Sequence, residues 1–450
     1  MRYRKARRRR QPGRRHLSFF YLLRNFYYNN IIWQIKILNK VENMVELLKK
    51  VRNSVNILSS LTPVVKEKVI LDMAKFLDSF RAEILLANDN DIKAAKLANL
   101  PFAMIERLKL DNKKIDAMIS SLEMTAALKD PVGRVIDGWI NADGLKIEKI
   151  AIPIGVICVI YESRPNVTTE VASLCFKSGN AVILKGGKEA FNSNKAIVKV
   201  IKTALKNNGV DENAVTFIES TERSVTEELI KYDNFIDVII PRGGESLVRF
   251  VSENSRIPVI KHDKGLCHIF VDESADFDEA LAICKNAKTQ NPSACNAVET
   301  VLVHKNTAAK FLPALRKNLQ SVKIYGSKKA QDFIKLDGEA DFEREYLDFA
   351  LNIDVVSGVD EAISHILKFS SHHSEAILSQ NERNIEKFLN SLDSACLYVN
   401  ASTRFSDGFQ FGFGAEIGIS TNKLHARGPV GLNELTTYKY IVRGNGQIRK

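Results

Sequence analysis

The sequence predicts an α/β protein with two doubly wound parallel sheets, and three observations carry that prediction. Apolar, β-branched runs alternate with helical segments along most of the 450-residue chain. Gly-Gly turns directly follow two of these runs, as they do at the carboxyl edge of a parallel sheet. A chain of this length also exceeds one ordinary hydrophobic core, so two or three domains are expected.

The first α/β unit is expected to follow a purely helical segment. From Met44 to about Leu128, apolar residues recur at spacings of three and four, and prolines interrupt the pattern. The period then changes to two, which is typical of strands. The elements expected next are strands within 145–163, 180–187 and 214–220, helices at 194–209 and 223–231, and a strand–turn–helix at 235–251.

A second α/β unit is expected to start near residue 257, without a flexible linker before it. Its predicted elements are a strand within 257–272, a helix at 276–287, a strand at 298–304, a helix at 307–319 and a strand at 322–326. The final segment, 435–447, also has a period of two. We expect it to pair with another strand, and a strand of a partner subunit is one candidate.

The basic character of the chain lies in its first residues. Residues 1–43 contain 12 of the 65 Lys/Arg residues but only one of the 53 Asp/Glu residues. The rest of the chain therefore has 53 basic and 52 acidic residues. Composition is otherwise typical of a soluble globular protein, with 45% hydrophobic and 26% charged residues. A near-neutral body argues against nucleic acid as the main partner.

Residues 1–43 leave three interpretations open. They fit an organellar targeting segment, a nucleic-acid-binding arm, or a start codon placed too far upstream. We favour the last, because an amphipathic helix begins directly after Met44. The apolar part of the segment is too interrupted by charged and amide residues to cross a bilayer, so no membrane partner is expected.

Six cysteines without a CxxC pair favour a reduced, cytoplasmic setting. Cys295 lies in the polar stretch QNPSACNAVET, where exposure and neighbouring N–H groups would lower its pKa and supply thiolate. Cys158 and Cys284 lie in apolar contexts, where a thiol is a small hydrophobe. Spacing alone leaves both interpretations open for Cys295.

The two Gly-Gly turns suggest a dinucleotide site. Gly243 and Gly244 follow Arg242 at the end of an apolar strand, and Gly186 and Gly187 follow Lys185 in the same way. The backbone at such turns can approach a phosphate, and a following helix supplies N–H donors. Neither turn is a G-x-G-x-x-G motif or a P-loop, so each is weak evidence alone.

The histidines carry less information. His372 and His373 have no ligand partners at metal-binding spacing, so no metal is expected, and we expect solvated or helix-capping side chains. His262, His268 and His425 lie in polar, Gly-rich segments and could contact phosphate or substrate. The residues alone do not choose among these three.

Several long stretches, in order along the chain, resemble the aldehyde dehydrogenase superfamily and, within it, the gamma-glutamyl phosphate reductase branch. They are IPIGVICVIYESRPNVTTEVASLCFKSGNAVILKGGKEA, VIIPRGGESLV, NAKTQNPSACNAVETVLVH, AISHILKFSSHHSEAI and VNASTRFSDGFQFGFGAEIGISTNKLHARGPVGL. The resemblance covers about Met44 to Thr437. One residue, Phe369, departs from the His or Tyr that is usual in the branch.

The resemblance implies two Rossmann-type domains and a small oligomerisation β-flap. We therefore expect an extension at 1–43, N-terminal helices and a cofactor domain at 44–262, and a catalytic domain at 263–415. Residues 416–450 would return to the cofactor domain and supply an oligomerisation strand.

Site residues are also implied by the resemblance. Cys295 matches the catalytic thiol, and Asn166 matches the amide of the oxyanion hole. Cofactor contacts are implied for Lys185, Gly186, Gly187, Arg242, Gly243, Gly244 and Glu345. For the substrate we expect Arg164, His262, Ser402, Thr403, Arg404 and Arg427, since guanidinium groups suit carboxylates and phosphate.

The activity implied is NADPH-dependent reduction of L-glutamyl 5-phosphate to L-glutamate 5-semialdehyde in proline biosynthesis. The stretch VIKHDKG lacks the glutamate that activates water in hydrolytic members, which agrees with phosphate as the acyl acceptor. A homo-oligomer is expected, with glutamate 5-kinase as a further partner. The alternatives are another acylating, CoA-linked or phosphate-linked semialdehyde dehydrogenase, or a nucleic-acid-binding protein that acts through residues 1–43.

Overall fold

The computed structural model describes residues 42–261 and 264–449, and the chain divides into two compact units at Lys50 and Val51. Of the first unit, only the helical residues 42–50 are described; the helix that they begin continues to residue 58. The interpretations of 1–43 therefore fall almost entirely outside the described residues. No helix in the described part of the chain is long and apolar enough to span a membrane.

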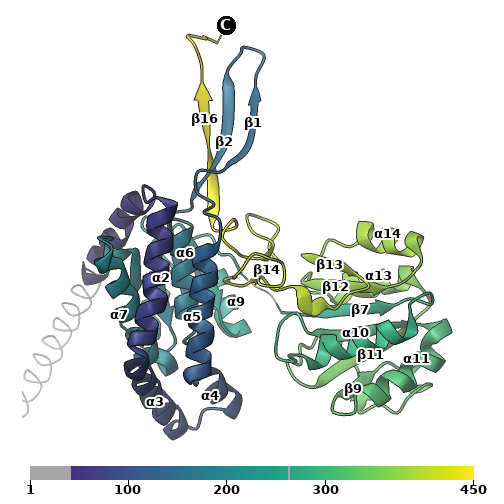
Figure 1. The fold of residues 1–450 in the computed structure, drawn as a ribbon. Helices are drawn as coiled ribbons and strands as arrows, with labels where there is room; N and C mark the ends of the chain where they lie inside the picture. The colour runs from purple at the N-terminus through teal and green to yellow at the C-terminus, as the bar shows by residue number, and fades with distance from the viewer. Residues whose placement is uncertain (1–41, 262–263, 450) are drawn as a thin grey trace, which may run out of the picture. The chain divides into compact units, whose positions relative to one another are not determined.

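Helices dominate the chain up to residue 127, as the apolar spacing predicts. Thr62 caps α2, where its side chain accepts the Val65 N–H at 3.4 Å and Pro63 occupies the first turn. Asp111 caps α5 in the same manner. The helices are α2 (Pro63–Ser79), α3 (Arg81–Leu97), α4 (Phe102–Leu108) and α5 (Asn112–Ala127). Of these, α2 and α5 pack side by side (Figure 1).

The first parallel sheet has four strands in the order β5-β4-β3-β6. Every residue of β3 and β4 is buried, which explains why these strands are continuous apolar runs. The strands are β3 (Val156–Tyr161), β4 (Ala181–Gly186), β5 (Val215–Phe217) and β6 (Val238–Arg242). The helices between and after them are α6 (Val167–Lys177), α7 (Phe191–Asn207), α8 (Arg223–Leu229) and α9 (Glu245–Asn254), with short 3₁₀ turns at Lys188–Ala190 and Glu212–Ala214.

The second parallel sheet has seven strands in the order β10-β9-β11-β8-β7-β12-β13. The strands are β7 (Cys267–Val271), β8 (Val298–His304), β9 (Lys323–Gly326), β10 (Gly338–Glu339), β11 (Ala350–Val356), β12 (Ser374–Leu378) and β13 (Cys396–Val399). The helices are α10 (Phe277–Thr289), α11 (Lys305–Asn318), α12 (Lys328–Gln331), α13 (Val359–Phe369) and α14 (Glu382–Ser391).

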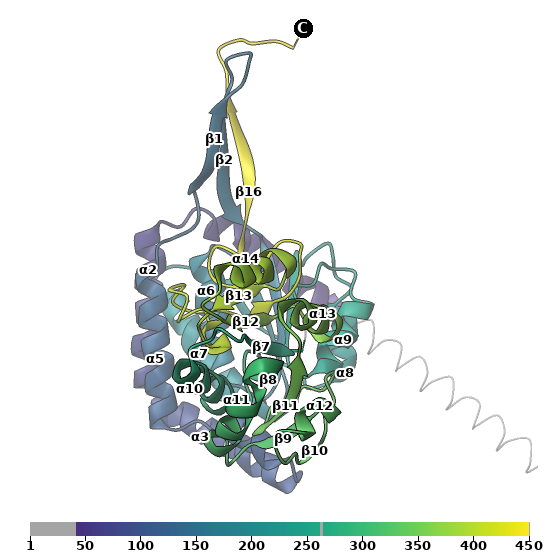
Figure 2. The ribbon, with the colours of Figure 1, turned by 90° about the vertical axis from the view of Figure 1, so that its right-hand side faces the viewer.

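Alternate residues of this sheet enter two separate hydrophobic clusters. Ile269 and Val271 of β7 pack with residues of α10 and α11, whereas Phe270 between them packs with residues of α13 and α14. Figures 1 and 2 show the strands between α13 and α14 on one side and α10 and α11 on the other. The sheet is thus covered on both faces, and the predicted doubly wound fold is confirmed.

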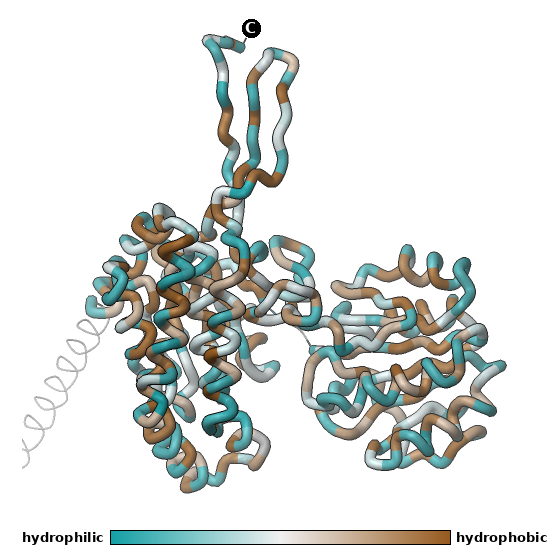
Figure 3. Tube along the Cα trace, viewed as in Figure 1, coloured by the Kyte–Doolittle hydropathy of each residue, from teal (hydrophilic) through white to brown (hydrophobic). Residues whose placement is uncertain are grey.

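A three-stranded antiparallel flap consists of β1 (Val135–Ile140), β2 (Lys146–Pro153) and β16 (Thr436–Arg443), in that order. Within the chain, β16 pairs with β2, so its partner strand does not have to come from another subunit. β1 was not expected, because all six of its residues are exposed and no buried face marks it. Hydrophobic and hydrophilic residues intermingle along the flap (Figure 3).

Short elements complete the C-terminal part: a 3₁₀ turn at Thr403–Phe405 and the two-residue strands β14 (Ile419–Ser420) and β15 (Gly428–Pro429), which pair with each other. The domain boundaries at 43, 262 and 415 remain predictions, since the compact division of the chain follows other limits.

Candidate active site

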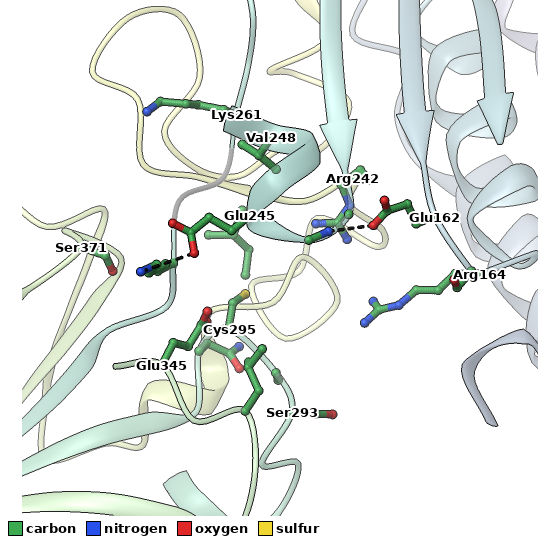
Figure 4. Close-up of a pocket in the computed structure, with 18 of the residues that line it drawn as sticks. Glu162, Arg164, Arg242, Glu245, Val248, Lys261, Ser293, Cys295, Glu345 and Ser371 are labelled. Carbon is green, nitrogen blue, oxygen red and sulfur yellow. Dashed lines mark hydrogen bonds and ion pairs between the residues drawn. The ribbon is translucent and has the colours of Figure 1, made fainter. Parts of the chain in front are cut away.

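A pocket of about 980 Å³ in the second unit gathers side chains from distant parts of the sequence. The carboxyl ends of β3 and β6 contribute Glu162, Arg164, Arg242 and the Gly243–Gly244 turn. Cys295 comes from the loop between α10 and β8. In Figure 4, Glu162, Arg164, Arg242 and Cys295 lie around one space, with Glu345 beside the thiol. The lining also includes Arg404, Asp407 and Glu416 from the C-terminal segment.

The backbone of Cys295 is held from behind by two residues of the 265–267 segment. A Cβ on Gly265 would lie 1.7 Å from the Cys295 carbonyl oxygen. The two backbone segments can therefore approach this closely only because residue 265 is glycine. The Cys267 thiol donates to the same oxygen at 3.3 Å. Cys295 is half-buried, whereas the other five cysteines are buried. These contacts fix the backbone that carries the pocket thiol.

The expectation of a lowered Cys295 pKa is wrong for this structure. Burial, the largest influence, raises the pKa of the thiol to about 11. The Arg242 guanidinium acts in the opposite direction, and Arg404 adds to it weakly. The carboxylates of Glu416 and Glu345 raise the pKa further. Desolvation therefore outweighs the cations.

Two of the five arginines that line the pocket lie at the ends of strands of the first parallel sheet. Arg242 ends β6 and Arg164 follows β3, and the Arg164 side chain points into the pocket (Figure 4). Burial and the charge of Arg242 lower the Arg164 pKa, while the Cys295 thiolate would raise it. Arg164 and Arg242 thus place two positive charges in the same pocket, as an anion-binding site requires.

Two half-buried carboxyl groups near this site escaped the sequence analysis. Burial raises the pKa of Glu416 to about 7, although its carboxylate accepts the Gly408 N–H at 3.0 Å. Burial likewise raises the pKa of Glu170. Glu416 lies in the quoted motif FGFGAEIG, where an isolated acid among apolar residues was the available signal.

Glu345 also lines the pocket, as the resemblance implies for a cofactor contact. Its carboxylate accepts the Gly265 N–H at 2.8 Å, and burial raises its pKa. Glu345 is therefore hydrogen-bonded to Gly265, the residue that packs against the Cys295 backbone.

Asn166, the predicted oxyanion amide, occupies the N-cap position of α6 without a side-chain capping bond, and its Nδ2 donates to Glu170 at 2.9 Å. Its neighbours Arg164 and Val167 line the pocket, but Asn166 does not. Its proposed role stays a prediction, and the amide would first have to leave Glu170.

The two glycine turns are each packed against a carboxylate. Glu162 accepts the Gly244 N–H at 2.8 Å, and a Cβ on Gly243 would lie 2.4 Å from the same carboxylate. A Cβ on Gly187 would lie 2.3 Å from the Glu189 carboxylate. The Gly243–Gly244 turn lines the pocket, whereas Gly186, Gly187 and Lys185 do not.

Lys185 is buried in β4, where its ammonium donates to the Gly186 carbonyl at 3.1 Å. Burial lowers its pKa. Its predicted contact with an adenine ribose is not tested by this arrangement and stays a prediction.

The expected substrate-binding residues separate into two groups. Arg404 lines the pocket, where its Nε donates to Gln290 at 2.9 Å. Ser402 and Thr403 do not line it: Ser402 caps the 3₁₀ turn, and Thr403 donates to the Asn296 carbonyl at 2.7 Å. Arg427 also lies outside the lining and donates to the Asp393 carbonyl.

The histidines differ from expectation in two places. His373 is fully buried, with Nδ1 2.9 Å from the Ser374 hydroxyl, so it is neither solvated nor a helix cap. His268 is buried in β7 beside Glu375 rather than in a polar loop. His425 bonds to the Glu434 carbonyl, and His262 lies outside the described residues. No metal-binding group of His, Cys, Asp and Glu occurs among the residues with described positions.

Comparisons with known proteins identify the family of this chain. The model of the aldehyde dehydrogenase family matches residues 81–334. The gamma-glutamyl phosphate reductase of Nitratiruptor sp. is 53% identical over 86% of this chain and 95% of its own length. That of Nautilia profundicola is 52% identical over 88% and 97%. The chain belongs to the gamma-glutamyl phosphate reductase family.

Solved structures support the same family and fold. The gamma-glutamyl phosphate reductase of Thermotoga maritima is 48% identical, with a TM-score of 0.88 over 90% of this chain and 99% of its own. An acetylating aldehyde dehydrogenase from Geobacillus thermoglucosidasius shares the fold at 17% identity, with a TM-score of 0.66 over 92% and 99% of the two chains. The gamma-glutamyl phosphate reductase fold of this chain is thus an aldehyde dehydrogenase fold.

Proposed function

We propose that this protein reduces L-glutamyl 5-phosphate to L-glutamate 5-semialdehyde and phosphate with NADPH, a step of proline biosynthesis. The observation that carries the proposal is the half-buried Cys295 thiol in a pocket that Arg164 and Arg242 also line. Membership of the gamma-glutamyl phosphate reductase family supports it.

Cys295 is the nucleophile in this mechanism. Its thiolate attacks the acyl carbon of the substrate, and the carbon–oxygen bond to phosphate breaks with the electron pair leaving on phosphate. A thioester on Cys295 remains. After reduction of that carbon, the carbon–sulfur bond breaks, the aldehyde forms and Cys295 recovers its electron pair as thiolate.

Cations and N–H donors stabilise the charges that develop. Arg242 favours the thiolate, since it lowers the Cys295 pKa. Arg164, which points into the same pocket, suits the departing phosphate as a bidentate donor. The Asn166 amide and the Cys295 N–H would hold the oxyanion once Asn166 turns from Glu170.

The residues around the Gly243–Gly244 turn fit a dinucleotide cofactor. An anionic oxygen of Glu162 already lies 2.8 Å from the Gly244 nitrogen at the start of α9, so this turn accepts anions. The turn would hold the pyrophosphate of NADPH, Lys185 the adenine ribose, and Glu345 the nicotinamide ribose. When bound, NADPH supplies the hydride.

Arg404 is our candidate for the substrate α-carboxylate. It lines the pocket, and its guanidinium has one side-chain partner, the neutral amide of Gln290, among the described hydrogen bonds. Arg427 remains a weaker candidate, because it lies outside the lining.

We further propose a cytoplasmic homo-oligomer that receives its substrate from glutamate 5-kinase. The flap presents Trp139, Ile140, Tyr440 and Val442 as exposed side chains, and one edge of β16 has no partner strand within the described chain. Such an edge suits association with another copy of the flap.

The decisive assay runs the reaction in reverse, from glutamate 5-semialdehyde and NADP to NADPH. The wild type should reduce NADP only when phosphate is present. Cys295→Ala should lose activity at least about a thousandfold, with NADPH binding retained. A requirement for coenzyme A instead of phosphate would indicate another acylating dehydrogenase, and activity retained by Cys295→Ala would refute the thiol mechanism.

A further inference from the structure

A buried ion pair between Lys288 and Glu299 lies outside the pocket lining. Lys288 Nζ is 3.1 Å from Glu299 Oε2, and the two side chains are 0% and 1% exposed. Lys288 is on the last turn of α10, and Glu299 is the second residue of β8. The pair therefore joins the two ends of the loop that carries Cys295.

Glu299 also binds a third segment. Its other oxygen, Oε1, accepts the Leu347 N–H at 3.3 Å, and the Tyr346 backbone contributes a further hydrogen bond. Leu347 has a φ of 52°, in the left-handed region that a leucine rarely adopts. Such a conformation is strained and persists only where surrounding contacts enforce it.

The segment that Glu299 holds begins with Glu345. Both Glu345 and Leu347 line the pocket, on either side of Tyr346. Glu345 accepts the N–H of Gly265, the glycine against the Cys295 carbonyl. Displacement of the 345–347 segment would therefore move a carboxylate that lies beside the thiol (Figure 4).

Stability does not explain why this pair is ionic. Two charges buried in this way lose their hydration, and an apolar pair of similar volume is often as stable or more stable. Consistent with this cost, burial raises the pKa of Glu299 to about 7 and lowers that of Lys288. The hydrogen bonds from Glu299 to the 345–347 segment are what an apolar pair could not supply.

We propose that Glu299, oriented by Lys288, is a positioning residue that fixes the 345–347 segment and thereby sets where Glu345 receives the nicotinamide ribose of NADPH relative to Cys295. This inference rests on the proposed function. Glu299 acts only through Glu345 and does not contact the substrate.

Two double variants separate hydrogen bonding from charge. Lys288→Met with Glu299→Gln removes both charges but keeps an oxygen acceptor for the Leu347 N–H. Lys288→Met with Glu299→Leu removes both charges and the acceptor. NADPH affinity is measured by fluorescence titration, and Cys295 reactivity by its rate of alkylation with iodoacetamide.

The leucine variant should bind NADPH about tenfold more weakly than the wild type, which corresponds to about 1.4 kcal/mol. The glutamine variant should stay within about threefold of the wild type. Alkylation of Cys295 should change little in both, since burial and Arg242 act on the thiol pKa more strongly than Glu345 does, whereas a general loss of structure would accelerate alkylation strongly. Equal NADPH affinity in all three proteins, or equal losses in both variants, would refute the positioning role.

Tyr346→Phe is a second route to the same segment that spares the buried pair. It removes the bond from the Tyr346 hydroxyl to Asn352 Oδ1, 2.9 Å long, but keeps the ring stacked on Tyr325. If the leucine variant does not fold, weaker NADPH binding by Tyr346→Phe supports the inference, and unchanged binding refutes it. A wild type that does not bind NADPH would instead contradict the proposed function.

Discussion

The carboxylate of Glu162 accepts the backbone N–H of Gly244 at 2.8 Å, at the first turn of α9. Gly243 has no Cβ, and this lets the carboxylate approach. The protein thus places one of its own acids at the helix N-terminus where we propose the cofactor pyrophosphate binds.

We expect Glu162→Gln to bind NADPH about threefold more tightly than the wild type, because it removes a negative charge from beside the pyrophosphate. Fluorescence titration at low and moderate salt measures the dissociation constant. Glu227→Gln, on the exposed face of α8, is a control and should leave it unchanged. Weaker binding by Glu162→Gln would show that the carboxylate supports the turn instead.

Alkylation of Cys295 by iodoacetamide should accelerate about tenfold per pH unit from pH 7 to pH 10, because a thiol with a pKa of about 11 is mostly protonated there. Arg242→Gln should slow alkylation throughout this range, since it removes the cation that most lowers the pKa. Arg242→Lys keeps the charge and should react faster than Arg242→Gln. Mass spectrometry of the peptide that contains Cys295 follows the reaction; a rate that levels off below pH 8 would contradict the prediction.

Arg404→Ala should raise the KM for glutamate 5-semialdehyde by about tenfold to a hundredfold and change kcat little, because it removes a charged hydrogen bond to the substrate carboxylate. Arg427→Ala is the matched control from the same family motifs, and its KM should stay near the wild-type value. Steady-state kinetics of both variants test this assignment. The reverse pattern would transfer the carboxylate site to Arg427.

Glu416 should make the protein less stable as the pH rises from about 5 to 8. Its pKa is near 7 in the folded state and 4.5 as the reference value, so the folded state holds more protons in this range. Glu416→Gln removes this effect. Its stability relative to the wild type should therefore increase by about 1–3 kcal/mol between pH 5 and pH 8 in urea unfolding. A difference that does not change with pH would exclude a raised Glu416 pKa.

The parts of the fold that sequence could predict are those whose burial is regular. β3 and β4 are apolar runs because every residue is buried, and α2 shows its helical period because one face is. β1 has no buried face, so no periodicity marked it. Its hydrogen bonds come from β2, which is a tertiary contact.

The sequence could predict which types of residue form the site, but not how deeply the folded chain buries them or which groups surround them. The position of Cys295 in a polar loop is visible in the sequence, whereas its raised pKa depends on burial by the folded chain. The Asn166–Glu170 hydrogen bond has a helical spacing of four and could have been anticipated. The contact between Glu299 and Leu347 joins segments far apart in the chain, so no local sequence pattern predicts it.

The close approach of Gly265 to Cys295 has a consequence for natural variants that carry another residue at position 265. Residue 265 is thirty positions from the proposed nucleophile in the sequence, so a change from glycine to a residue as small as alanine would look harmless there. Even one methyl group would collide with the Cys295 carbonyl. Under the proposed mechanism, such an allele should behave as a loss of the Cys295 thiol although the codon for cysteine stays intact.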